Sequence, residues 1–279
     1  MALVDGFRKL VKLKFLLAFS AVFSCYQTFV ISYLQPSFTL LYFVFFSTLA
    51  AYNIRKFIFY PGLSQVAFKN KKQPSVKDVV FLGAVVLCFI CWWQLSANLK
   101  ITTAALASAA LLYIMPFNRG AEKLKGIRNI FILKNIWLAL SWASVTVALP
   151  LLAAGELICD QQNILIFLSR FLFVYSIALV FDIRDTHQDT QKNVITLPVN
   201  IGVKATKTVA IVCSFLFCML IYWRATASKT FIDFSLPLYF SAVLLLLVIL
   251  MAKPGQRFWF YEVVTDGLLL MQAVAVLWT

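Results

Sequence analysis

The sequence predicts an all-α integral membrane protein, a bundle of nine transmembrane helices. Of its 279 residues, 62% are hydrophobic and only 13% are charged, and the mean hydropathy is +0.87. Soluble domains are closer to half apolar and a quarter charged. The apolar runs are continuous and about 20 residues long, as a membrane helix requires, whereas the strands of a membrane β-barrel alternate apolar and polar residues. These features exclude a soluble domain, a coiled coil and a disulfide-stapled module.

Nine apolar stretches each predict one membrane span within a single domain covering residues 1–279. The fourth stretch is rich in Ala, Ser and Thr. Small side chains let helix backbones approach closely, so we expect this helix to be buried at the centre of the bundle. The nine stretches are residues 15–34, 38–58, 78–96, 101–115, 131–154, 162–181, 206–223, 232–252 and 258–278.

The basic residues predict the orientation of the bundle. Nearly all of the 25 Lys and Arg residues fall in alternate connections, which therefore lie on one side, while the other side holds only Lys100, Arg224 and Lys229. Because basic loops stay in the cytoplasm, we expect a cytoplasmic N-terminus, an outer C-terminus and a cytoplasmic working face, in a bacterial inner membrane. No soluble segment is long enough to present the net charge of +14 to nucleic acid. The longest cytoplasmic loops are predicted at 59–77, 116–130 and 182–205.

An acidic stripe is the strongest local pattern. Asp182, Asp185 and Asp189 stand at positions i, i+3 and i+7, so a continuing helix places all three on one face. Mg²⁺ accepts such carboxylates together with water and phosphate oxygens. A hydrated helix end with solvated acids is the alternative, and spacing alone leaves both interpretations open.

The residues after this stripe carry a family resemblance. The stretch from Asp182 to Gly202, with its Thr-Leu-Pro-Val-Asn-Ile-Gly ending, resembles the second aspartate motif of the UbiA superfamily of intramembrane prenyltransferases. That family also has nine helices, an inside N-terminus and cytoplasmic working loops. Further similar positions are Tyr113 to Arg119, Lys134, Asn135 and Trp142.

The resemblance implies a reaction and its participants. An isoprenyl diphosphate would ionise, and its allylic carbon would alkylate an aromatic, lipid-soluble acceptor on the way to a quinone or pigment. Mg²⁺ would neutralise the diphosphate, held by Asp182, Asp185 and Asp189 as catalytic and metal-binding residues. The candidate diphosphate contacts are Asn53, Arg55, Lys56, Tyr113, Arg119 and Lys134.

The sequence departs from the family at the first aspartate motif. Where relatives carry Asn-Asp-x-x-Asp, this chain has Asn53 followed by Ile54 and, three residues later, Phe57. There is no Asp or Glu between Asp5 and Asp78. One half of the expected metal cradle is therefore absent, and this weakens the prediction of Mg²⁺.

Two outcomes of this departure stay open. In one, Arg55 and Lys56 contact the diphosphate directly and replace the metal with fixed cations, since guanidinium binds phosphate in a bidentate fork. In the other, the site binds an anionic lipid or nothing, and the chain is a non-catalytic membrane binding or assembly protein of the same fold. Interfacial anchoring of a helix end is a further explanation of Arg55 and Lys56. A small transporter is a third class, but no pair of Gly- or Pro-broken spans recurs in the two halves.

A charge within a span predicts a buried partner. Arg170 lies about eight residues inside the sixth stretch, where an unpaired charge costs several kcal/mol. Glu262 and Asp266, four residues apart on one face of the ninth stretch, are the predicted partners.

The remaining reactive side chains indicate little chemistry. His187 is the only histidine, so histidine-rich metal sites are excluded, and we expect it to be exposed rather than a base. Cys88 and Cys91 form a C-x-x-C within a span, where thiols are usually apolar fillers.

Overall fold

The computed structural model describes residues 14–54, 76–114, 133–191, 194–227, 232–256 and 260–277. All regular elements in these ranges are helical, and each of the nine predicted stretches contains helix. Two π-helical segments, η2 (Ser144–Ala148) and η4 (Phe260–Thr265), lead into α9 and α13. The α-helices are α2 (Phe15–Ile31), α3 (Phe38–Asn53), α6 (Val76–Gln94), α7 (Ala97–Ile114), α8 (Leu133–Ala143), α9 (Leu149–Ala153), α10 (Gln161–Gln191), α11 (Leu197–Ala227), α12 (Ile232–Met251) and α13 (Asp266–Val276).

Several of these helices have the length and composition of membrane spans. In the described residues, four continuous segments are long and apolar enough to cross a bilayer: Leu133–Ala153, Gln161–Gln191, Leu197–Ala227 and Asp233–Met251. Four shorter apolar helices accompany them, within α2, α3, α6 and η4–α13. The chain is therefore an all-helical, multi-pass membrane protein, while the count of nine spans and their orientation stay predictions.

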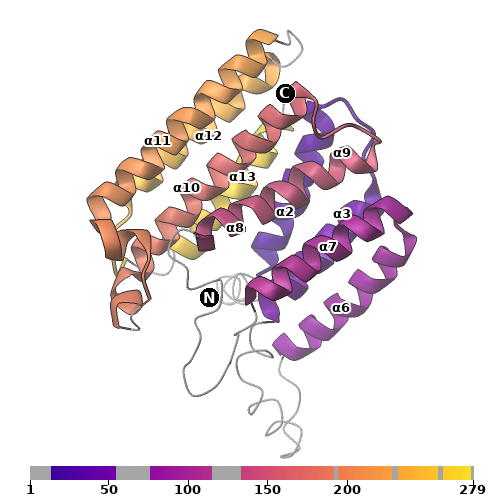
Figure 1. The fold of residues 1–279 in the computed structure, drawn as a ribbon, viewed down its shortest axis with the longest axis horizontal. Helices are drawn as coiled ribbons and strands as arrows, with labels where there is room; N and C mark the ends of the chain where they lie inside the picture. Colours follow the sequence, from indigo (N-terminus) through magenta and orange to yellow (C-terminus); the bar gives the residue numbers. More distant parts are fainter. Residues whose placement is uncertain are drawn as a thin grey trace, which may run out of the picture.

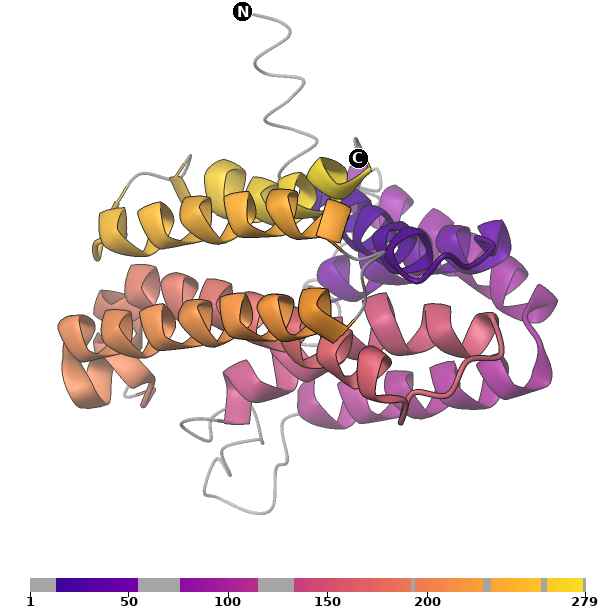
Figure 2. The same cartoon turned by 90° about the horizontal axis from the view of Figure 1, so that it is seen from above.

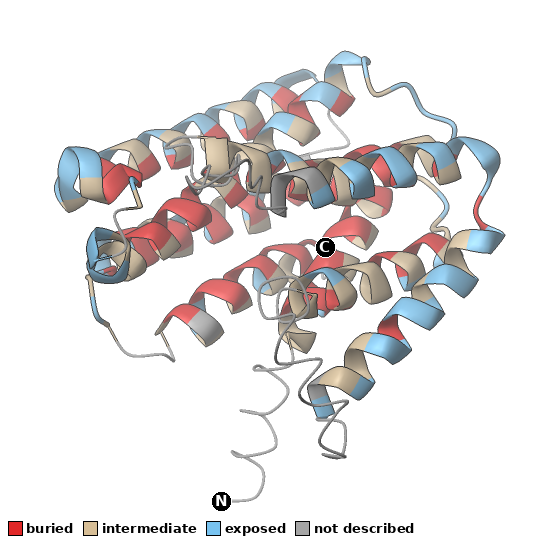
Figure 3. Ribbon diagram, turned by 60° about the horizontal axis from the view of Figure 1, so that its bottom comes forward, coloured by how far each residue is buried: buried red, intermediate tan, exposed pale blue. Residues whose placement is uncertain are grey.

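The helices are arranged as a ring with an attached wing (Figures 1 and 2). α2 packs against α13, and the contacts continue through α12, α11 and α10 to η2, which returns to α2. The wing begins with α3, which packs on α2, and continues with α6. Figure 3 shows that buried residues gather on the faces that the helices turn toward one another.

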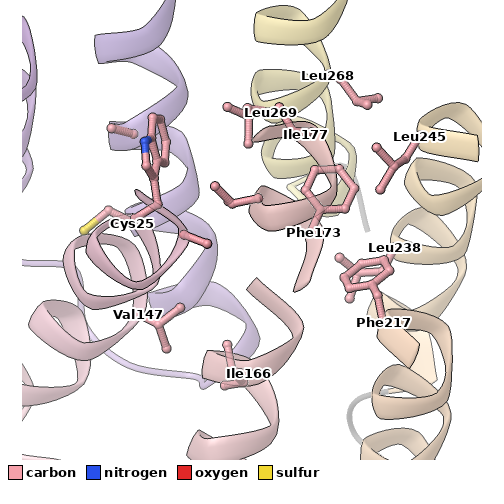
Figure 4. Packing of buried hydrophobic residues seen from close by; sticks show 14 of the residues in the cluster. Cys25, Val147, Ile166, Phe173, Ile177, Phe217, Leu238, Leu245, Leu268 and Leu269 are labelled. Atoms are coloured by element: carbon pink, nitrogen blue, oxygen red, sulfur yellow. The ribbon is translucent and has the colours of Figure 1, made fainter. Parts of the chain in front are cut away.

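Aromatic and small side chains fill the interior of the ring. Phe173 of α10 and Phe217 of α11 are both fully buried, with ring centroids 5.2 Å apart, and Figure 4 shows them facing one another. Nearby, the Ser176 hydroxyl donates a 3.3 Å hydrogen bond to the carbonyl of Ala210. A small residue at this point permits the close approach of the two longest helices.

A proline explains one polar contact in the core. Pro150 has no N–H, so the carbonyl of Thr146 cannot accept the usual helical bond from residue 150. The hydroxyl of Thr28 on α2 donates to this carbonyl at 2.7 Å. Since an unsatisfied carbonyl is costly where no water enters, this bond fixes α2 against η2.

Two expectations from the sequence are wrong. α7 is not a buried central helix: in its described side chains only Leu99 and Thr103 are buried, and its attachment to α6 includes the bond from Trp92 Nε1 to Thr103 Oγ1 at 3.1 Å. Small residues here do not mark a crowded interface. Residues 182–205 are also not one long loop, because α10 continues to Gln191 and α11 begins at Leu197.

Candidate functional site

Asp182 is a buried carboxylate held by two neighbours from another helix. It lies on α10 and is 2% exposed. Lys134 Nζ donates to Oδ1 at 2.6 Å, and Asn135 Nδ2 donates to Oδ2 at 2.6 Å. Both partners come from the first turn of α8, whose N-terminal end also favours a negative charge. The carboxylate is thus neutralised and hydrogen-bonded, as burial requires.

One face of α8 connects this carboxylate to α3. Trp142 follows Asn135 by seven residues, so the two share a face of the helix. The indole Nε1 of Trp142 donates to the hydroxyl of Tyr52 at 3.2 Å. Tyr52 lies in the last turn of α3, so one face of α8 contacts both Asp182 of α10 and the end of α3.

Asp185 is paired with the adjacent arginine. Arg184 Nε and one terminal nitrogen donate to the two carboxylate oxygens at 2.7 and 2.9 Å. The guanidinium also lies over the rings of Phe181 and Tyr261, at 5.0 and 5.5 Å from their centroids. A cation above aromatic faces is stabilised by them, so Arg184 is fixed between an acid and two rings.

Asp189 completes the predicted stripe. α10 is unbroken through Gln191, so the three acids do share one helical face. Asp189 interacts electrostatically with Lys134, Asp182 and Asp185, and its carboxylate lies near the hydroxyl of Thr196. Lys134 is therefore the cation that acts on both the first and the last acid of the stripe.

The described side chains do not fit a metal cradle built from all three acids. Both oxygens of Asp182 and both oxygens of Asp185 already accept bonds from side-chain donors. Within the described part of the chain, no group of three or more His, Cys, Asp and Glu is placed to hold a metal ion. Mg²⁺ stays a prediction, and the cations that the structure does place beside the acids are Lys134 and Arg184.

Only some of the predicted diphosphate contacts lie among the described residues. Lys134 lies at the site, as above. Asn53 ends α3, and its side-chain Nδ2 donates to the carbonyl of Leu49 on its own helix at 2.8 Å. Arg55, Lys56 and Arg119 lie outside the described residues, as does the side chain of Tyr113.

The predicted pairing of Arg170 with an acid on the ninth stretch is wrong for Asp266. The Arg170 guanidinium donates to Gln272 Oε1 at 3.0 Å and to Gln27 Oε1. Amide oxygens replace the expected carboxylate because α13 turns Gln272 toward Arg170. The side chain of Glu262 lies outside the described residues.

Two other expectations concern residues near the site or within a span. His187 is exposed, as expected, but it lies within α10 rather than in a loop. Cys88 and Cys91 are partly buried free thiols within α6.

Sequence reasoning missed three residues that build the site. The family resemblance includes Asn135 and Trp142 but implies no role for them, and no sequence pattern points to Tyr52. An asparagine directly after Lys134 in an apolar helix was the available clue, because a buried amide needs a partner. Nothing in the sequence pairs Trp142 with Tyr52, which is 90 residues away.

Solved structures share the fold of this chain. A UbiA homologue from Aeropyrum pernix K1 has a TM-score of 0.63 at 14% identity, over 93% of this chain and 94% of that one. A digeranylgeranylglyceryl phosphate synthase has a TM-score of 0.59 at 16% identity, over 100% of both chains. A UbiA homologue from Archaeoglobus fulgidus has a TM-score of 0.57 at 13% identity, over 98% of both chains. None of the curated proteins compared with the chain matches it.

A family model matches most of the sequence. It is the model of the UbiA prenyltransferase family, and it covers residues 71–278. The match begins after α3 and takes in the acidic stripe of α10. The chain therefore belongs to the UbiA prenyltransferase family.

Proposed function

We propose that this protein transfers an isoprenyl group from a prenyl diphosphate to an acceptor within the membrane. The observation that carries the proposal is the buried carboxylate of Asp182, held by Lys134 and Asn135 at one end of a UbiA-type bundle. Burying such a fixed polar cluster in an apolar protein costs free energy. Membership in the prenyltransferase family indicates the reaction in which the cluster would take part.

The proposed step breaks one bond and forms another. The bond between the allylic carbon and the diphosphate oxygen breaks, and its electron pair leaves with the diphosphate. The acceptor's nucleophilic atom bonds to that carbon and releases a proton. We propose an aromatic acceptor and a quinone or pigment as the final product.

Lys134 is the residue best placed to share its charge with the leaving diphosphate. Its side chain is 25% exposed while the side chain of Asp182 is 3% exposed, so Lys134 faces both the buried acid and the open side. Asp182 therefore acts as a positioning residue that keeps Lys134 at the mouth of the site.

Further contacts belong to the same proposal. We propose that Arg55, Lys56 and Arg119 supply fixed cations to the diphosphate, and that Asn53 and Tyr113 also contact it. Any Mg²⁺ would use Asp189 and the substrate's own phosphates, because Asp182 and Asp185 are occupied. We place the site at the cytoplasmic face of a bacterial inner membrane.

Reconstituted protein tests the proposal directly. Liposomes containing the protein receive labelled prenyl diphosphates and a panel of lipid-soluble phenols, with Mg²⁺ or with EDTA. We expect labelled prenyl product from the wild type and a loss of at least about 100-fold in Lys134→Met, which removes one charge-stabilising contact. Gln188→Ala, an exposed neighbour on the same helix end, serves as the control and retains activity.

Two outcomes contradict the proposal. One is the absence of any product across the panel while the protein remains folded, which favours the non-catalytic binding protein. The other is product formation that Lys134→Met leaves unchanged, which removes this site from the reaction.

A further inference from the structure

Three lysines gather where the start of α11 packs beside the end of α12. The Lys207 ammonium donates a 2.7 Å hydrogen bond to the carbonyl of Leu250, near the end of α12, and Lys253 acts on it electrostatically. Lys204 lies one turn before Lys207 on α11, where residues three apart are neighbours. Figures 1 and 2 show the two helices running alongside one another. This junction therefore concentrates positive charge on the surface of the ring.

Helix length places these lysines at one border of the membrane. Residues 208–227 of α11 and the 20 residues of α12 each rise about 30 Å. The hydrocarbon layer of a bilayer has about the same thickness. Lys207 lies directly before the first of these segments, and Lys253 follows the end of α12 by two positions. We therefore expect both ammonium groups at the level of the lipid headgroups.

The backbone around Lys253 is held in a defined turn. Gly255 has φ 71°, and the Lys253 N–H donates to Gln256 Oε1 at 3.2 Å. The hydroxyl of Tyr261 donates to the Lys253 carbonyl at 2.8 Å. The exposed side chain of Lys253 thus extends from a fixed backbone, and the bond to α12 holds Lys207 beside it. The cationic surface is preorganised.

Exposed apolar faces of both helices begin at the lysines. Val212 and Phe215 follow Lys204 at positions i+8 and i+11, so they share its face of α11. The apolar side chains on these two faces are between 49% and 63% exposed. In order of increasing distance from the lysines, they are Val212 and Phe215 on α11 and Leu250, Leu247, Val243 and Phe240 on α12. Each face extends roughly 15 Å, which is the depth of one leaflet.

We propose that Lys204, Lys207 and Lys253 bind the phosphate group of an anionic phospholipid whose acyl chains lie on these apolar faces. The cationic cluster matches the headgroup in charge, and the faces beneath it match the chains in polarity and length. A phosphocholine headgroup fits less well, because it carries a cation of its own. The site lies on the outer surface of α11 and α12, so it is independent of prenyl transfer.

Native mass spectrometry of the full chain in detergent measures this affinity. Phosphatidylglycerol and phosphatidylcholine with identical acyl chains are titrated separately. We expect the wild type to bind the first phosphatidylglycerol at least about 10-fold more tightly. Lys253→Gln weakens that binding about 5-fold, the contribution of one lysine at an anionic surface. The control Lys100→Gln removes a cation that lies over the ring of Trp93 and keeps the wild-type affinity.

A second measurement distinguishes a lipid from a free phosphate. The thermal unfolding midpoint is compared with phosphatidylglycerol or glycerol phosphate at equal concentration and ionic strength. We expect the lipid to raise the midpoint of the wild type by about 3 °C, since a ligand of the folded state stabilises it, and glycerol phosphate to leave it unchanged. The double variant Lys204→Gln/Lys253→Gln, which changes two exposed side chains, loses the rise.

Three results overturn the proposal. Equal affinity of the wild type for the two lipids shows that the headgroup charge is not recognised. Equal affinity of the wild type and Lys253→Gln for phosphatidylglycerol removes the site from this junction. An equal rise of the midpoint with glycerol phosphate identifies a free phosphate, rather than a lipid, as the ligand.

Discussion

The carboxylate of Asp182 depends on its partners for its stability. A charge left alone in such a position costs several kcal/mol, and breaking a buried pair by removing one partner costs about 3–5 kcal/mol. Lys134→Met leaves Asp182 buried without its cation, whereas Asp182→Asn leaves Lys134 able to reach water through its 25% exposed side chain. The two losses are therefore unequal.

A double-mutant cycle measures this pair. We expect Lys134→Met to lower the free energy of unfolding by about 3 kcal/mol and Asp182→Asn to lower it by less. The double variant recovers part of the loss, because no charge stays unpaired. Denaturant unfolding in detergent gives all four free energies, and strictly additive losses would show that the ion pair is not coupled.

The sequence reveals the acids of this site but not their partners. The spacing of Asp182, Asp185 and Asp189 follows from helical geometry, so their common face could be predicted. The neutralisation of Asp182 could not be predicted, because its cation, Lys134, lies on another helix 48 positions earlier in the sequence. The partner of Arg170 was predicted wrongly for a related reason: a carboxylate is the expected partner by charge, while packing of α13 supplies an amide.

At the scale of an element, η2 shows how a proline in a membrane helix creates a specific contact. Pro150 deprives the Thr146 carbonyl of its helical donor, and Thr28 of α2 supplies a hydroxyl instead. This is a single hydrogen bond, but it joins residues that are 118 positions apart in the sequence. It therefore fixes the register of α2 against η2.

Two substitutions test this compensation. Thr28→Val removes the hydroxyl at nearly constant shape and is expected to cost about 1–2 kcal/mol of stability. In a Pro150→Ala background the same change costs less, because an amide at 150 can serve the Thr146 carbonyl. Equal costs of Thr28→Val in the two backgrounds, measured by thermal unfolding, would contradict the explanation.

The start of α11 contains a backbone position that suits only glycine. Gly202 has φ 83° and ψ 160°, a non-helical conformation inside the helix, and this region is essentially restricted to glycine. A Cβ at Gly202 would meet nothing within 4 Å. Any cost of a side chain there is consequently a backbone cost.

Two alanine substitutions separate backbone strain from steric clash. Gly202→Ala is expected to lower stability by about 1–3 kcal/mol. The control is Gly83→Ala in the helical α6, which also has open space around the added carbon and is expected to be neutral or slightly stabilising. Equal effects of the two changes on the unfolding midpoint would show that strain at Gly202 is not the cause.

The sequence predicts where the helices lie better than where they end or which other helices they pack against. All nine apolar stretches contain helix because a backbone in lipid must satisfy its own hydrogen bonds. Apolar length predicts a loop for the polar end of α10, yet the helix continues to Gln191. The small residues of α7 predict a central helix, but composition does not reveal which neighbours a helix meets.

For the whole molecule, orientation in the membrane is the main untested prediction. The distribution of Lys and Arg places the connection between α9 and α10 on the outside. Cys159 lies in that connection and is the one exposed cysteine among the described residues. It is therefore a natural probe of orientation.

Thiol labelling checks the orientation. A membrane-impermeant maleimide added to intact cells is expected to label the wild type, and Cys159→Ser is expected to lose that labelling. Labelling only after the membrane is opened would invert the predicted topology and place Asp182 on the outer side.

The length of α10 has a consequence for where substrates meet the protein. Its 31 residues extend about 46 Å at 1.5 Å per residue, against a hydrocarbon layer of about 30 Å. In a membrane, we therefore expect the final turns, with Asp185 and Asp189, at the level of the lipid headgroups. Under the proposed function, a lipid with an apolar tail and a charged head would reach these acids by lateral diffusion within its own leaflet.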